Sequence, residues 1–189
     1  LWLINTHNGI KGVKPRIDIN DYPAVKAHLD QYWDKISKRA DKGDTPYNLR
    51  NCAYLDDFLK PKIVFQEIVQ ESQFLLDANE NFFCNDTGRI IVGKHLYHLL
   101  GMLNSELFFF SVKHFYGGGV LGEHGIRMKH TFFENFPCLA FDERIESIAK
   151  KLQQFYSNTL NQNLNDYIMT LYQLTEEEKL YIKGKLIQF

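Results

Sequence analysis

Residues 43–51 contain the side chains that come nearest to a catalytic pattern in this chain. Asp44-Thr45-Pro46-Tyr47 differs by one residue from the Asp/Asn-Pro-Pro-Tyr tetrapeptide that holds the target nitrogen when an exocyclic amino group of a DNA base is methylated. That reaction also needs a glycine-rich turn and an acidic strand end before the tetrapeptide, to bind S-adenosylmethionine. The residues before Asp44 predict only a helix that carries lysines and an arginine. We therefore expect a turn with another role, and a methyltransferase catalytic fragment acting through residues 44–47 is the weaker alternative.

The other patterns that could support catalysis are incomplete. Glu67 and Glu71 lack the lysine two positions later that the commonest restriction nucleases place beside their metal-binding carboxylates. His95 and His98 have a helical spacing that suits a metal, but no third ligand stands near them in the sequence. The glycine-rich residues 117–125 lack the Gly-Lys-Ser/Thr ending of a phosphate-binding loop. We therefore predict no catalytic residue and no metal site in this chain.

Composition indicates a folded, cytoplasmic protein without a membrane segment. Of the 189 residues, 44% are hydrophobic and 14% are aromatic, so one core with a small appendage is expected. The chain begins without Met and shows no charged segment followed by a long apolar run, so we read it as part of a longer polypeptide without a signal peptide. Three dispersed cysteines, Cys52, Cys84 and Cys138, predict buried thiols in a reducing compartment.

The charge of the chain is nearly balanced, but one segment is basic. The formal net charge is −1, so binding to a polyanion would have to come from local asymmetry. Residues 88–131 carry two acidic side chains and five basic ones, which are Arg89, Lys94, Lys113, Arg127 and Lys129. The segment is therefore favoured for contacts with nucleic acid, and an ordinary fluctuation along a solvated surface is the alternative.

Hydrophobic periodicity predicts an α+β fold, with a mixed, twisted sheet packed on helices and a C-terminal helical tail. Apolar residues have helical spacing over residues 22–42 and 95–113. Runs of β-branched and aromatic residues predict strands near residues 1–6, 61–70, 73–91 and 126–130. We accordingly divide the chain into a domain of residues 1–141 and a helical tail of residues 142–189.

Alternation along a strand at residues 126–130 would separate its side chains into two sets. Arg127 and Lys129 would lie on one face, and Met128 and His130 on the other. The pattern therefore predicts that the two basic side chains act on the same surface.

Several short stretches occur in an order that is similar to one protein family. They are Arg39 with Asp41 and Gly43, Tyr47-x-Leu49-Arg50, Lys60-Pro61-Lys62-Ile63, Leu103-Asn104-Ser105, and a closing segment at Pro137. Over residues 1–141 the chain resembles the TaqI-like specificity domain. That domain is the target-recognition part that follows the methyltransferase in single-chain restriction-modification enzymes and in related adenine-specific DNA methyltransferases.

The resemblance implies sequence-specific recognition of double-stranded DNA. S-adenosylmethionine would bind in an upstream methyltransferase domain that modifies an adenine, and Mg²⁺ would bind in an endonuclease where the parent chain carries one. No cofactor is expected in residues 1–189 themselves. The alternative from another class is a protein-interaction module whose tail docks a helical partner.

The residues suited to DNA contacts can form two-point hydrogen bonds to base edges, reach phosphates, or permit close approach of the backbone. The candidate set is Tyr47, Arg50, Lys62, Gln66, Gln70, Arg89, Gly117, Gly118, Gly119, His124, Arg127 and Lys129. Each could instead be an ordinary solvated side chain or loop residue. Phe108, Phe109 and Phe110 are predicted to be core residues and not to stack on bases, because a helix that is apolar all round is buried.

Overall fold

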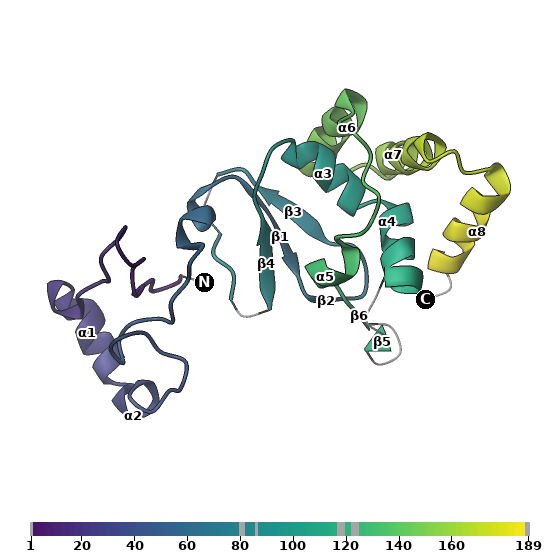
Figure 1. Cartoon of the computed structure of the whole chain (residues 1–189). Coiled ribbons are helices and arrows are strands. Elements are labelled where there is room, and N and C mark those ends of the chain that lie inside the picture. Colours follow the sequence, from purple (N-terminus) through teal and green to yellow (C-terminus); the bar gives the residue numbers. More distant parts are fainter. Residues whose placement is uncertain (1, 80–81, 86, 117–119, 122–124, 188–189) are drawn as a thin grey trace. The chain divides into compact units, whose positions relative to one another are not determined.

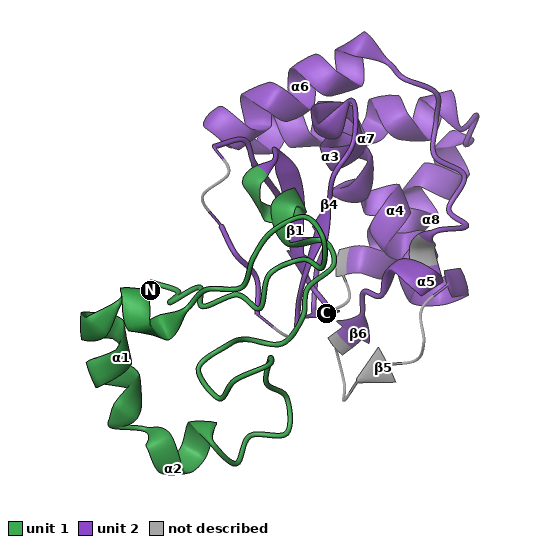
Figure 2. Ribbon diagram, turned by 60° about the vertical axis from the view of Figure 1, so that its left-hand side comes forward, with its two compact units in different colours: residues 1–59 green, residues 60–189 purple. Residues whose placement is uncertain are grey.

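Two compact units make up the chain, Leu1–Leu59 and Lys60–Phe189 (Figure 1, Figure 2). The computed structural model describes residues 2–79, 82–85, 87–116, 120–121 and 125–187. The division after Leu59 differs from the domain boundary that we expected after residue 141, and the helices beyond that residue belong to the second unit.

The first unit contains short helices joined by long connecting segments. The 3₁₀ helix η1 (Ile19–Asp21) precedes α1 (Pro23–Asp30) and α2 (Trp33–Ile36), and η2 (Leu55–Leu59) ends the unit. The single helix predicted over residues 22–42 is therefore wrong in length. Neither α1 nor α2 buries a residue, and a helix without a packed face is only marginally stable in water.

No strand forms over residues 2–6, where we predicted one. The backbone there bonds to a loop: Leu49 N donates to Thr6 O at 2.9 Å, and Thr6 Oγ1 donates to Tyr47 O at 2.7 Å. These bonds hold the segment in place, but they do not form the repeated pairing of a β-ladder.

The second unit contains two small antiparallel sheets. In the first sheet, β1 (Lys62–Gln66) lies between β3 (Phe74–Asp77) and β4 (Gly88–Ile91). In the second sheet, β6 lies between β2 and β5; the bounds are Gly125–Arg127, Ile68–Val69 and Val120–Leu121. All pairings between these strands are antiparallel, so the predicted mixed sheet is wrong. The short connection from β1 to β3 favours an antiparallel pair, since parallel strands need long crossovers.

The long strands that we predicted are each divided. The segment 61–70 becomes β1 and β2, which belong to different sheets, and the segment 73–91 becomes β3 and β4 on opposite edges of β1. The last predicted strand ends at Arg127. His130 is exposed and begins α5, so it does not share a face with the buried Met128 as we expected.

Helices form the remainder of the second unit. α3 (Leu96–Leu103) is followed by α4 (Glu106–Ser111) and by the π-helical η3 (Val112–Tyr116), so the helix predicted over residues 95–113 is interrupted. Ser105 causes the interruption, because its hydroxyl accepts a hydrogen bond from Phe108 N at 3.2 Å and caps a new helix. The later helices are α5 (His130–Phe133), α6 (Glu143–Gln154), α7 (Asn158–Leu171) and α8 (Glu176–Ile187).

Helices α3 and α4 lie between two hydrophobic clusters. One cluster joins Leu100 and Phe108 to side chains of the sheets, and the other joins Met102 and Phe110 to side chains of α6, α7 and α8. The helices of the predicted tail thus share a core with α3 and α4. The fold is α+β, as predicted, and the core assignment of Phe108 is confirmed because its side chain is fully buried.

Two expectations from composition can be compared with the structure. Cys52 and Cys84 are half-buried and Cys138 is exposed, so the prediction of three buried thiols is wrong. Over the described ranges, no helix combines the length and the apolar character that crossing a membrane requires.

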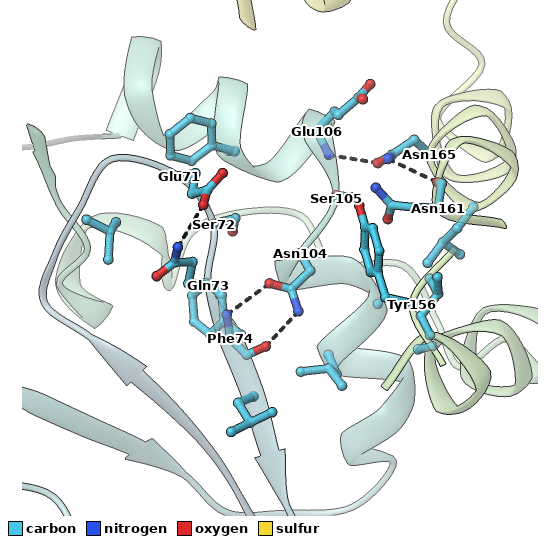
Figure 3. A pocket seen from close by; sticks show the side chains of 18 of the residues that line it. Glu71, Ser72, Gln73, Phe74, Asn104, Ser105, Glu106, Tyr156, Asn161 and Asn165 are labelled. Atoms are coloured by element: carbon cyan, nitrogen blue, oxygen red, sulfur yellow. Dashed lines mark hydrogen bonds between the residues drawn. The ribbon is translucent and has the colours of Figure 1, made fainter. Parts of the chain in front are cut away.

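Side-chain amides occupy the outer edge of strand β3. Asn104 Oδ1 accepts from Phe74 N at 2.9 Å and its Nδ2 donates to Phe74 O at 2.8 Å, as Figure 3 shows. Gln153 repeats the arrangement at Leu76, with distances of 3.0 and 2.7 Å. Two amides from α6 and from the end of α3 thereby replace a neighbouring strand at an edge that would otherwise leave backbone groups unpaired.

Replacing Gln153 by alanine is expected to lower the free energy of unfolding by about 1–3 kcal/mol, because the paired N–H and C=O of Leu76 would lose their partners. Urea unfolding followed by circular dichroism measures the change. Gln154→Ala is the matched control, since Gln154 is exposed at the end of the same helix. Equal effects of the two substitutions would contradict a role for Gln153 at the strand edge.

Candidate nucleic-acid interface

Glu67 is the residue at which the chain leaves one sheet and enters the other. Gln66 is in register with Gly88 in the first sheet, and Ile68 is in register with Arg127 in the second. The backbone of Glu67 forms two hydrogen bonds to distant parts of the chain. Its N–H donates to Thr87 O at 3.0 Å, and its C=O accepts from Met128 N at 2.6 Å. The backbone of Glu67 is therefore held by residues that adjoin a strand of each sheet.

Three basic side chains converge on the carboxylate of Glu67. Arg89 Nη2 donates to Oε2 at 2.5 Å, while Oε1 lies 3.8 Å from Arg127 Nε and 3.7 Å from Lys129 Nζ. Glu67, Arg89, Arg127 and Lys129 are called the Glu67 cluster below. The structure thus brings together three of the predicted DNA contacts, Arg89 from β4, Arg127 from β6 and Lys129 from the start of α5, and Arg127 and Lys129 do share one surface.

The electrostatics of the Glu67 cluster favour an anionic ligand. Three cations surround one carboxylate, so the cluster has a local charge of +2. The Glu67 side chain is 12% exposed, whereas the three basic side chains are each about 40% exposed. The carboxylate is therefore enclosed by the cations, and parts of those cations face solvent. Arginine can present a fork of donors to a phosphate or a base edge, and lysine a point charge to a phosphate.

Gln66 and Gln70 lie on a different surface from the Glu67 cluster. Gln66 Oε1 accepts from Thr87 Oγ1 at 3.2 Å, and both glutamines line a cleft of about 1350 Å³. None of the four cluster residues is among the described residues that line this cleft.

The polar groups of the cleft mostly stabilise the fold. Figure 3 shows Asn104 bonded to Phe74, and Asn165 Oδ1 accepting from Glu106 N at 2.8 Å. Burial raises the pKa of the Glu106 carboxyl and lowers the pKa of Lys113, another residue of the lining. Of the residues that the structure describes there, the charged ones that line the cleft are Glu71, Glu106 and Lys113, so the cleft lacks the excess of positive charge that the Glu67 cluster has.

Lys62 is not placed where it could contact a phosphate. Its side chain is completely buried, and Nζ donates to Asp77 Oδ2 at 2.5 Å. Lys62 and Asp77 are register partners on β1 and β3, which brings the two charges together in the interior. The sequence showed a lysine at the start of a strand but not the acidic side chain opposite it.

Tyr47 and Arg50 belong to the first unit and take part in local contacts there. Tyr47 Oη donates to Asp30 Oδ1 at 2.5 Å, and hydrogen bonds from Lys26 and then Tyr47 lower the pKa of the Asp30 carboxyl. Arg50 is exposed and pairs with Asp41 at 3.4 Å. The remaining candidates, Gly117, Gly118, Gly119 and His124, lie outside the described residues.

The segment that resembles a catalytic tetrapeptide is held by its own unit. Asp44 Oδ1 accepts from Asn8 Nδ2 at 3.0 Å. The buried Asn48 donates from Nδ2 to Ile17 O at 3.0 Å, and its Oδ1 accepts from Thr45 Oγ1 at 2.6 Å. These bonds connect the loop to segments about 30 residues or more before it in the sequence, so its side chains have a clear architectural role.

The histidine pair lies on α3 and beside its start. His98 is buried, which lowers its pKa, and His95 Nδ1 lies 3.9 Å from Glu146 Oε2. Both rings contact Phe141. The described part of the chain contains no group of three histidine, cysteine or acidic side chains that could hold a metal ion.

Comparisons with known proteins add no relative to this picture. No protein-family model matches the chain, and no curated protein matches it. The resemblance to the TaqI-like specificity domain accordingly stays a prediction.

Proposed function

We propose that this chain binds double-stranded DNA and recognises its sequence, and that the Glu67 cluster is the contact surface. The observation that carries the proposal is the convergence of Arg89, Arg127 and Lys129 on one enclosed carboxylate. Phosphate contacts supply affinity and orientation, whereas base contacts supply specificity. A surface that holds two arginines and a lysine beside each other offers side chains for both.

The positions of these cations suit recognition for a second reason. Arg89 is part of β4, and Arg127 is part of β6, so both side chains start from paired strands. A ligand would therefore meet donors whose backbone is already ordered, which reduces the conformational entropy lost on binding.

The resemblance places this activity in a restriction-modification setting. In that setting the chain would be the target-recognition part of an adenine-specific DNA methyltransferase, with or without a fused endonuclease, acting in the cytoplasm. S-adenosylmethionine, and Mg²⁺ for a nuclease, would bind in the other domains of that enzyme.

One observation supports the alternative of a protein-interaction module. Leu180 and Tyr181 are 68% and 59% exposed on α8, although α8 also contributes the buried Ile182 to the core. A helical partner could cover these two side chains. We favour DNA as the main ligand, because the Glu67 cluster concentrates like charge, which a protein partner would have to neutralise.

Selection from duplex DNA with a randomised core tests the proposed function. The chain is expected to bind random duplex weakly and to enrich one sequence. The logarithm of its binding constant should fall with the logarithm of salt concentration with a slope of about −2 to −3, since two or three cations would displace counterions from phosphates. Lys151→Ala, which removes an exposed cation from α6, should behave as the unaltered chain does. A binding constant that does not change with salt concentration, or a selection that enriches no sequence, would contradict the proposal.

A further inference from the structure

We propose that Glu67 is a positioning residue that determines how well this chain discriminates between DNA sequences. The inference rests on the proposed function and adds a role for an acidic residue within a basic surface. In this role the carboxylate restrains the two arginines for contact with base edges and at the same time opposes indiscriminate binding to phosphates.

The restraint follows from how the carboxylate is shared. Oε2 accepts from Arg89, which comes from the first sheet, and Oε1 faces Arg127, which comes from the second sheet, and Lys129, which lies two residues later. Glu67 itself is fixed by backbone bonds to Thr87 and Met128. One side chain therefore sets the orientation of cations from both sheets, and a bidentate contact with a base edge depends on orientation more than a phosphate contact does.

The second effect is electrostatic. A carboxylate near the DNA repels phosphates and lowers the affinity for every sequence alike. Removing its charge would change the local charge from +2 to +3, which favours phosphate contacts with any duplex. Arginines without this partner would also be able to turn toward the backbone of the DNA. Loss of Glu67 should thus strengthen nonspecific binding and weaken the preference for one sequence.

The experiment compares the unaltered chain with Glu67→Gln. Fluorescence anisotropy would give the dissociation constants for the enriched duplex and for a scrambled duplex of equal length, at several salt concentrations. Glu67→Gln is expected to bind the scrambled duplex more tightly, with a salt slope steeper by about 0.9. The ratio of the two dissociation constants should shrink by about tenfold, the size of the discrimination that a bidentate arginine contact supplies.

Two further variants keep the test decisive. Glu71→Gln removes the same charge from an exposed side chain four residues later and should leave the ratio unchanged. Glu67→Asp keeps the charge but shortens its reach, so it should lose discrimination without gaining nonspecific affinity, and it replaces Glu67→Gln where that variant does not fold.

The outcomes separate this inference from the proposed function. A chain that binds no duplex overturns both. A chain that prefers one sequence, with a ratio unchanged in Glu67→Gln and in Glu67→Asp, overturns only the role of Glu67. The same holds where both variants lose affinity for the two duplexes in equal proportion, because Glu67 would then only stabilise the fold.

Discussion

Replacing Lys62 by methionine is expected to lower the free energy of unfolding by about 3–5 kcal/mol, because it leaves the carboxylate of Asp77 charged in the interior without its cation. The Lys62 and Asp77 side chains are 0% and 2% exposed, so water cannot take the place of the ammonium group. Methionine has a similar length and fills the same space, which makes the lost charge the main change. Urea unfolding at pH 7 measures the effect.

The matched control is Lys151→Met, which replaces an exposed lysine of α6 and should change stability by less than about 0.5 kcal/mol. Replacing both partners, as Lys62→Met with Asp77→Leu, removes the uncompensated charge and should restore part of the stability. The recovery will be incomplete because Asp77 also accepts hydrogen bonds from Phe82 N at 2.9 Å and Asn79 N at 3.3 Å. A Lys62→Met chain as stable as the unaltered one would show that the pair contributes nothing.

The fold class was predictable, because it depends on the spacing of apolar residues. Leu96, Leu100 and Leu103 recur at helical spacing and do form one face of α3 in the core. The ends of the elements were not predictable in the same way. Ser105 starts a new helix, and Asn104 bonds to Phe74, 30 residues earlier in the chain. Such breaks depend on single hydrogen bonds between distant segments, which periodicity does not reveal.

The candidate site could likewise be predicted from the sequence only in part. Residue type alone identified Arg89, Arg127 and Lys129 as suited to DNA. Their grouping depends on Glu67, which the sequence presented only as a carboxylate without a nuclease lysine. The one sequence signal was a charged residue that interrupts the apolar run of residues 63–69, where the structure shows the change of sheet. Lys62 was predicted to contact DNA because the sequence does not show that Asp77 lies opposite it. That pairing depends on the register of β1 and β3.

Arg127→Ala and Lys129→Ala are expected to weaken DNA binding in different ways, although both side chains lie within 4 Å of the same oxygen of Glu67. Arg127 can place two donors on a guanine edge, so its loss should cost about 1–3 kcal/mol at the preferred sequence and relax discrimination at one base position. Lys129 presents a single ammonium group, which suits a phosphate. Lys129→Ala should weaken binding to all sequences alike and flatten the salt slope by about one unit.

A competition assay across all single-base variants of the enriched duplex distinguishes the two roles, with Lys151→Ala as the control for loss of one positive charge. The pattern matters more than the size of the loss, because a fold that is weakened by either substitution would lower the affinity for every duplex. If Arg127→Ala lowers affinity uniformly and leaves the ratios between duplexes unchanged, Arg127 contacts phosphate and does not read a base. If neither substitution changes binding, the DNA does not lie on the Glu67 cluster, and the exposed Arg50 or Gln66 becomes the next position to substitute.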